Sequence, residues 1–137
     1  MKTPILFGLL IFLITACKKK DEPQIEEPDS PTQYELFIGN WDITSRSVDG
    51  ISSLETLNET FVFTTSADGS QTEGTAIHSS DGYDNNLSFT LKASQDSIIF
   101  TKESGSTMRC YYEMFETHFT LLYQAEEGIT QENWEKQ

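Results

Sequence analysis

Four side chains in this sequence have the types that most often carry chemistry: Cys17, Cys110, His78 and His118. A thiolate or an imidazole acts as a nucleophile, a general base or a metal ligand when suitable partners lie nearby. The histidines are far apart in the chain, and no H-E-x-x-H, C-x-x-C or G-x-S-x-G motif surrounds them. Acids are plentiful, but a general acid–base pair needs a carboxyl group with a shifted pKa, which abundance alone does not supply. We therefore predict no catalytic residue, no metal site and no cofactor, and expect both histidines to be strand or turn residues.

Cys17 stands between an apolar segment, residues 4–14, and the charged run KKKDE at residues 18–22. About a dozen apolar residues make a helix of about 18 Å, shorter than the roughly 30 Å hydrocarbon core of a bilayer. With Lys2 at its start, this segment is typical of an export signal. The sequence ITAC at residues 14–17 resembles the bacterial lipobox. That resemblance implies cleavage after Ala16 and lipidation of Cys17, with acyl chains such as palmitate. The alternative is an ordinary secretory signal with a chance cysteine.

The run at residues 18–22 also resembles a lysine-plus-acid tag with which one group of Gram-negative bacteria routes lipoproteins to the outer face of the outer membrane. The resemblance implies a cell-envelope protein, an outer-membrane lipoprotein exposed at the cell surface. Its membrane partner would be engaged through the lipid on Cys17. The competing interpretation is that the three lysines lie against anionic lipid head groups.

Residues 17–32 are predicted to form a tether between the lipid and a folded domain. Within it, residues 21–32 contain three prolines and five acids, so they cannot bury enough apolar surface to offset chain entropy. The remaining residues, 33–137, suffice for one small domain. The formal charge is −13, and it becomes about −14 once residues 1–16 are removed with Lys2, which argues against nucleic acid as a partner.

Apolar and polar side chains alternate along most of this domain. The segment LSFTLK, residues 87–92, alternates strictly, which indicates a strand with one buried face. The same pattern predicts seven further strands, at residues 41–48, 59–66, 71–78, 97–102, 106–115, 118–124 and 130–136.

Turn signals such as Asp49-Gly50, Asp81-Gly82 and Ser104-Gly105 separate these strands. Consecutive strands therefore form antiparallel hairpins, with no room for crossover helices. Such an up-and-down meander has two exposed edges, which closure into a barrel removes. We predict an all-β fold, a small antiparallel barrel of about eight strands. A helical turn at residues 32–37 is expected to cap one end, and residues 79–86, SSDGYDNN, are expected to form a loop.

Two further positions on these strands, Cys110 and Ser97, carry side chains that can be modified. Cys110 has no disulfide partner if Cys17 is lipidated, and we expect it to be a buried, inert thiol. Asp96-Ser97-Ile98 resembles a short site at which some bacteria O-glycosylate exported proteins.

The segment FIGNWDITSRSVDG, residues 37–50, resembles the opening of a lipocalin, where a short helical turn precedes a G-x-W motif, here Gly39-Asn40-Trp41. Residues 61–70 and 111–124 are similar to hairpins of compact lipocalin-like domains in bacterial lipoproteins, so the resemblance covers about residues 33–137. It implies that Gly39 allows a tight entry into the first strand and that Trp41 plugs the bottom of the barrel. In larger lipocalins an arginine of the final strand stacks on this indole. Only Lys136 is available here, which speaks against that clamp, and Trp134 is expected to take over part of the closure by packing.

The resemblance to lipocalins also implies a small hydrophobic ligand inside the barrel. An eight-stranded barrel either encloses one small ligand or fills itself with side chains. The first possibility makes the chain a non-catalytic binder and requires an apolar cup of at least about 300 Å³. The second makes it a cell-envelope interaction module that contacts a protein or a glycan through its loops, with Tyr83 and Phe115 as exposed candidates. The side chains expected to line or floor a ligand cavity are Phe61, Phe63, Phe89, Phe100, Met108, Tyr112, Met114 and Leu121.

The lipidation hypothesis makes a direct prediction about Cys17. Cys17→Ala removes the acyl acceptor, so the chain is expected to leave the membrane fraction almost completely, because acyl chains contribute about 0.8 kcal/mol of membrane affinity per buried CH₂. Cell fractionation followed by immunoblotting measures this. A Cys17→Ala chain that stays with the membranes would refute the lipobox interpretation.

Overall fold

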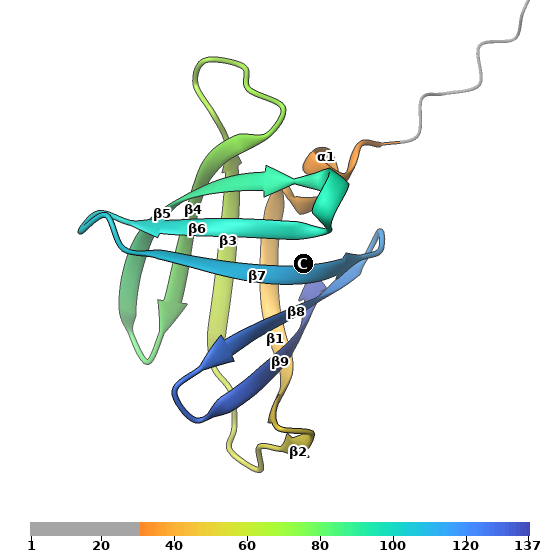
Figure 1. The fold of residues 1–137 in the computed structure, drawn as a ribbon, viewed down its shortest axis with the longest axis vertical. Coiled ribbons are helices and arrows are strands. Elements are labelled where there is room, and N and C mark those ends of the chain that lie inside the picture. Colours follow the sequence, from red (N-terminus) through yellow and green to blue (C-terminus); the bar gives the residue numbers. More distant parts are fainter. Residues whose placement is uncertain (1–30) are drawn as a thin grey trace, which may run out of the picture.

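The computed structural model describes residues 31–137, so the predicted signal peptide, Cys17 and most of the predicted tether lie outside the described residues. One short helix precedes nine strands (Figure 1). Within residues 31–137, no helix is long and apolar enough to cross a membrane. The elements are α1 (Gln33–Phe37), β1 (Gly39–Val48), β2 (Ile51–Ser52), β3 (Glu59–Thr65), β4 (Glu73–Ser80), β5 (Tyr83–Lys92), a 3₁₀ turn (Ala93–Gln95), β6 (Ser97–Lys102), β7 (Thr107–Met114), β8 (His118–Ala125) and β9 (Gly128–Lys136).

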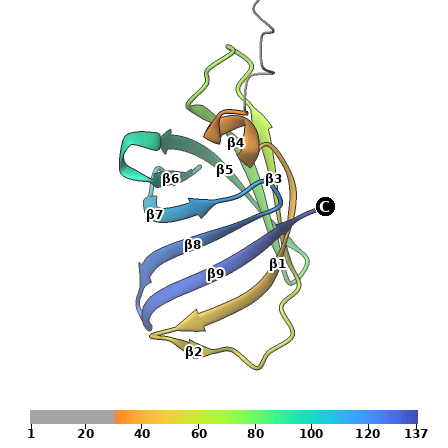
Figure 2. The same cartoon turned by 90° about the vertical axis from the view of Figure 1, so that its right-hand side faces the viewer.

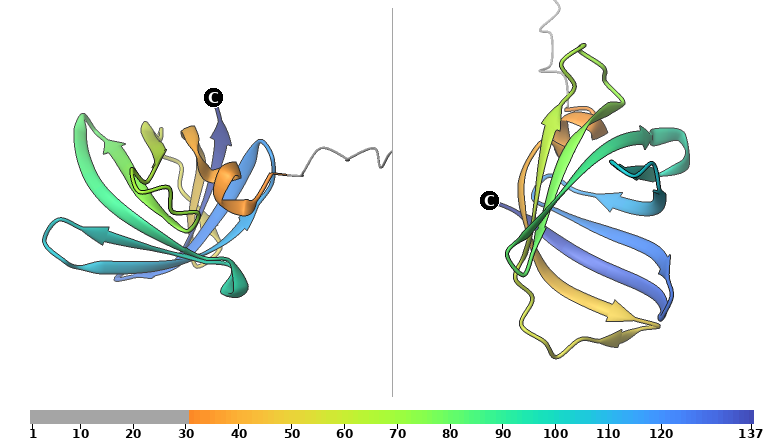
Figure 3. Two further views of the ribbon diagram at one scale, coloured as in Figure 1. Left: turned by 90° about the horizontal axis from the view of Figure 1, so that it is seen from above. Right: turned by 90° about the vertical axis from the view of Figure 1, so that its left-hand side faces the viewer.

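Eight of these strands form a closed antiparallel barrel, which confirms the predicted fold class. Neighbours in sequence are neighbours in the sheet from β3 to β9, and β1 closes the barrel by pairing with both β3 and β9. The strands curve around a common interior, with β1 beside β9 (Figures 2 and 3). Strand β2, which the alternation pattern did not predict, is a two-residue addition paired with the end of β1.

The expected loop at residues 79–86 is wrong. Asp81 and Gly82 alone make the turn, with φ values of 52° and 80°, and Ser80 pairs with Tyr83 directly beside them. A two-residue turn with both φ values positive matches the twist of the flanking strands, so β4 and β5 extend almost to its tip. Ser79 and Ser80 are half-buried residues of β4, and Asp84, Asn85 and Asn86 are exposed residues of β5.

Helix α1 covers one end of the barrel, which we call the closed end. Thr32 caps it: its hydroxyl accepts a hydrogen bond from the backbone of Glu35, and the Glu35 carboxylate accepts one from the backbone of Thr32. Phe37 is fully buried, and the Tyr34 hydroxyl donates to the Glu73 carbonyl at 2.9 Å. The helix therefore plugs the end that it covers. The opposite end, where β2 lies, we call the mouth (Figure 1).

Gly39 and Trp41 hold the junction between α1 and β1. Gly39 has a φ of 133°, which side-chain-bearing residues rarely adopt, and a Cβ there would lie 3.2 Å from Cε of Lys136. The Trp41 indole is fully buried and donates to the Phe37 carbonyl at 2.8 Å. Lys136 lies with Nζ 5.2 Å from the centre of that indole and also donates to the Leu36 carbonyl. Lys136 therefore lies over the Trp41 indole, which corrects the expectation that the final strand provides no clamp.

Gly74 of β4 gives a test of how tightly the closed end is packed. A Cβ at Gly74 would meet the Thr64 carbonyl and the Phe89 ring, so Gly74→Ala should cost about 2–3 kcal/mol of unfolding free energy through overpacking. Urea denaturation measures the loss. Gly105→Ala is the matched control, because a Cβ there meets nothing within 4 Å. Only the φ of 86° at Gly105 disfavours alanine, so this variant should lose about 1 kcal/mol of unfolding free energy. Equal losses in the two variants would contradict the tight packing.

Candidate functional site

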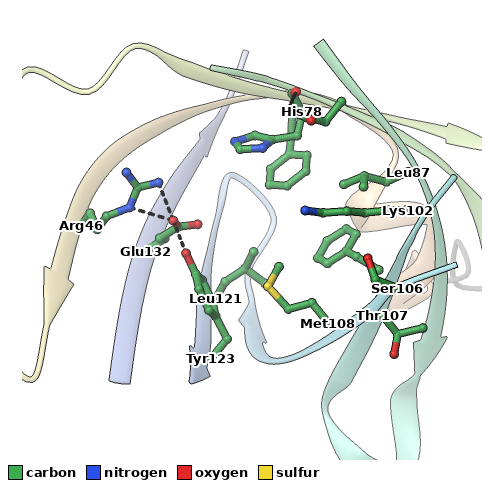
Figure 4. Close-up of a pocket in the computed structure, with 13 residues that line it drawn as sticks. Arg46, His78, Leu87, Lys102, Ser106, Thr107, Met108, Leu121, Tyr123 and Glu132 are labelled. Atoms are coloured by element: carbon green, nitrogen blue, oxygen red, sulfur yellow. Dashed lines mark hydrogen bonds and ion pairs between the residues drawn. The ribbon is translucent and has the colours of Figure 1, made fainter. Parts of the chain in front are cut away.

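A pocket of about 320 Å³ lies inside the barrel and faces the mouth (Figure 4). All eight barrel strands contribute to its wall: β1 and β3 to β9. One part of the wall is apolar and the other carries charge. The apolar part consists of Phe61, Leu87, Phe100, Met108 and Leu121.

Four of the eight predicted lining residues are in this wall, namely Phe61, Phe100, Met108 and Leu121. The other four do not line the pocket. Phe63 and Phe89 are fully packed against α1, Tyr112 donates to Gln33 at 2.6 Å, and Met114 packs against the core. Alternation correctly puts such residues on the inner face, but it does not say at which depth of the barrel each one lies.

The charged part of the wall is built around Arg46. Its Nη1 and Nη2 donate to the two oxygens of Glu59, at 2.7 and 2.8 Å. Nε and Nη2 also donate to Oε1 of Glu132, at 2.9 and 2.6 Å. Glu132 is only 4% exposed, so this arginine is what makes a carboxylate tolerable in the interior.

Three neighbouring groups complete this network. His78 Nε2 lies 2.9 Å from Oε2 of Glu59, the Tyr123 hydroxyl donates to Oε1 of Glu132 at 2.8 Å, and Trp134 Nε1 donates to Oε2 of Glu132 at 3.2 Å. Trp134 is fully buried, stacked on Phe119 and close to Phe61. The indole thus joins the aromatic packing of the closed end to the charged wall of the pocket.

The network fixes the protonation of two of its members, Glu59 and Tyr123. Burial acts to raise the pKa of Glu59, but hydrogen bonds from Arg46 and His78 outweigh it, so the pKa lies below the ordinary value and the group is ionised at neutral pH. Burial, together with the charge of Glu132, raises the pKa of Tyr123, which stays a neutral donor. Glu59 therefore contributes a fixed negative charge beside the pocket, and Tyr123 contributes a hydrogen-bond donor.

Sequence reasoning missed these polar residues, although a signal for most of them exists. Glu59 and Glu132 each lie two residues from a buried aromatic, Phe61 and Trp134, so alternation places them on the inner face. Arg46 is different. A bulge in β1 between Ile43 and Ser45 shifts the alternation by one residue and turns Arg46 inward opposite Glu132.

Several other predicted residues have a simple structural place. Cys110 is buried and free, and burial, with the charge of Glu132 as a second cause, raises its pKa to about 12. Ser97 is fully buried in the folded barrel, which removes it as an acceptor for a glycan. His118 stacks on Phe115 at 4.3 Å between ring centres. Among the residues that the structure describes, no three His, Cys, Asp or Glu side chains are grouped to hold a metal ion.

Comparison with known proteins supports the architecture alone. Searches against protein-family profiles and against curated proteins find no match to this chain. Among solved structures, a redesigned β-barrel superposes with a TM-score of 0.52 and 16% sequence identity, over 76% of this chain and 94% of that one. At this identity the likeness shows that the chain folds as a β-barrel and carries no information about a ligand.

The charged wall makes a prediction about stability. Arg46→Leu would leave Glu59 and Glu132 without their counter-ion, so we expect a loss of about 2–4 kcal/mol of unfolding free energy, reduced from the fully buried case because Arg46 is partly exposed. Adding Glu59→Gln and Glu132→Gln should recover about half of the loss, because no unpaired charge then remains. Urea denaturation measures both.

Arg109→Leu is the control for this experiment, because Arg109 is exposed on the outer face of β7 and should change stability by about 0.5 kcal/mol or less. A loss in Arg46→Leu no larger than in Arg109→Leu would mean that the carboxylates do not need the arginine.

Proposed function

We propose that this chain is a non-catalytic binder that encloses one small, mainly hydrophobic molecule in the mouth half of its barrel. The observation that carries the proposal is the pocket of about 320 Å³ in an interior that is otherwise filled by side chains. Ligand pockets span about 300–1,000 Å³ and are lined mostly by apolar side chains with a few placed polar groups. This pocket lies at the small end of that range.

The apolar wall supplies the driving force for binding. Phe61 and Phe100, which both line the pocket, stack with ring centres 5.5 Å apart and planes 10° from parallel. Leu121 in the same wall is buried, and Met108 is 41% exposed. A ligand that covers these side chains removes their apolar surface from water, at about 25 cal/mol per Å².

The state of the polar wall supports binding rather than catalysis. A general acid needs a carboxyl group that keeps its proton near neutral pH, whereas arginine and histidine hold Glu59 ionised. Cys110 is buried with a raised pKa, which is the opposite of an activated thiol.

We further propose that the chain is a lipocalin-like lipoprotein of the cell envelope, anchored through Cys17. The lipobox resemblance and the lysine-plus-acid run support the anchor and the outer-membrane location. The conformation of Gly39 and the burial of Trp41 are consistent with the G-x-W resemblance, because both residues do what that motif requires of them.

The alternative, an interaction module with a filled barrel, has less support. Tyr83 is 77% exposed beside the β4–β5 turn at the mouth, whereas Phe115 belongs to the β7–β8 turn at the closed end. Because the two aromatics lie at opposite ends, they do not form one docking patch.

Met108→Trp tests the proposed function. An indole at this partly exposed position fills the pocket without entering the core, so the full chain should bind an apolar fluorescent probe about tenfold more weakly. Fluorescence titration gives the affinity, and native mass spectrometry reports whether a molecule co-purified from bacteria is lost. Tyr111→Trp adds the same indole to the outer face of β7 and should change neither. Equal binding by both variants would argue against a ligand inside the barrel.

A further inference from the structure

The polar groups of the pocket differ in whether they have hydrogen-bonding capacity left for a ligand. The two carboxylates of the charged wall use seven of about eight acceptor sites, whereas the ammonium group of Lys102 has no partner within residues 31–137. We propose, on the basis of the binding function above, that the ligand is an amphiphile with a carboxylate head group and that Lys102 binds this head group at the mouth.

The backbone places Lys102 on the inner face. In β6 the inward residues are Ile98 and Phe100, both buried, and Lys102 follows at the same two-residue spacing. Its cross-strand partner is Leu87, which is also in the pocket wall. Figure 4 shows the side chain reaching into the pocket between the apolar residues, with its nitrogen foremost.

The two carboxylates of the wall have little capacity left for a cationic ligand. An ionised carboxylate offers about four acceptor sites. Glu132 uses four, for two bonds from Arg46 and one each from Tyr123 and Trp134. Glu59 uses three, for two bonds from Arg46 and one contact with His78. A ligand ammonium would therefore find about one acceptor site free on the two carboxylates, both of which are already paired with Arg46.

Lys102, in contrast, has three N–H donors and forms no ion pair within residues 31–137. Asp84 and Glu103 line a shallow surface groove together with Lys102, but neither carboxylate lies within 4 Å of its nitrogen. The charged residues that line the pocket, apart from His78, are Arg46, Lys102 and Glu132, and Glu59 pairs with Arg46 beside this lining, so two cations stand against two carboxylates. A carboxylate can therefore enter although the chain as a whole carries −13.

The positions of these groups along the strands define how the ligand is oriented in the pocket. The stacked rings of Phe61 and Phe100 and the buried Leu121 receive the apolar tail, and Lys102 stands at the end of the wall nearest the mouth. The carboxylate would pair with Lys102 where water still reaches it, which avoids the cost of burying the head group completely.

The test compares ligands with one tail and three head groups: decanoate, decanol and decylammonium. The full chain and its variants are placed in identical lipid nanodiscs, and binding is followed by tryptophan fluorescence, because Trp134 lies close to Phe61 of the pocket wall. Each ligand partitions equally into the lipid for every variant. The ratio of decanoate to decanol affinity, compared between variants, therefore isolates the head-group contact.

We expect Lys102→Met to weaken decanoate binding about five- to tenfold and to leave decanol binding unchanged, as for one charge-assisted contact in a partly exposed site. Lys102→Arg should retain most of the decanoate affinity. Lys92→Met, which removes the same charge from the outer face near the closed end, should have no effect on the ratio.

Each other outcome is decisive. If Lys102→Met weakens the binding of decanoate and decanol equally, or weakens neither, the carboxylate assignment is overturned. The proposed binding function would still stand. Tighter binding of decylammonium would overturn it in the same way. Failure of all three ligands to bind the unmodified chain would overturn the proposed function together with this inference.

Discussion

Closure of this barrel depends on β1, which must pair with β9 on one side and β3 on the other. It pairs with β9 from Trp41 to Val48 but with β3 only from Gly39 to Asp42, so the backbone ladder to β3 ends well before the mouth. The bulge in β1 then directs Arg46 inward, where its guanidinium binds Glu59 of β3 and Glu132 of β9. Side-chain hydrogen bonds thus join β1 to β3 where the backbone hydrogen bonds between them end. The pocket can exist because these side chains connect the two strands without filling the interior.

The aromatic residues at the closed end determine how much space the pocket has. Phe37 of α1 meets Tyr112 edge-on at 5.0 Å between ring centres and also contacts Phe63 and Phe119, so the helix is anchored by the same rings that fill the interior below it. Trp134 borders this cluster and also donates to Glu132. Since the floor of the pocket is part of the hydrophobic core, its shape is set by folding before any ligand arrives, which limits the ordering cost of binding.

Much of this architecture could be predicted from sequence, because alternation and turn residues are local signals. The strand positions and the barrel followed from them, and the exceptions are instructive. Residues 79–86 looked like a loop by composition, but a two-residue turn needs only Asp81 and Gly82. The charged wall was overlooked because polarity argues for exposure while alternation argues for the inner face, and only the pairing of Arg46 with two distant carboxylates resolves the conflict. The bulge that turns Arg46 inward has no recognisable local pattern.

The position of α1 also gives the barrel a direction. Residue 31 and α1 lie at the closed end, and β2, with the β4–β5 and β8–β9 turns, lies at the mouth. If the chain is held to a bilayer through its N-terminus, as proposed, the lipid is attached on the side that is sealed by Phe37 and Trp41. The mouth is then left unobstructed by the attachment, so cargo can enter and leave the pocket while the chain stays anchored.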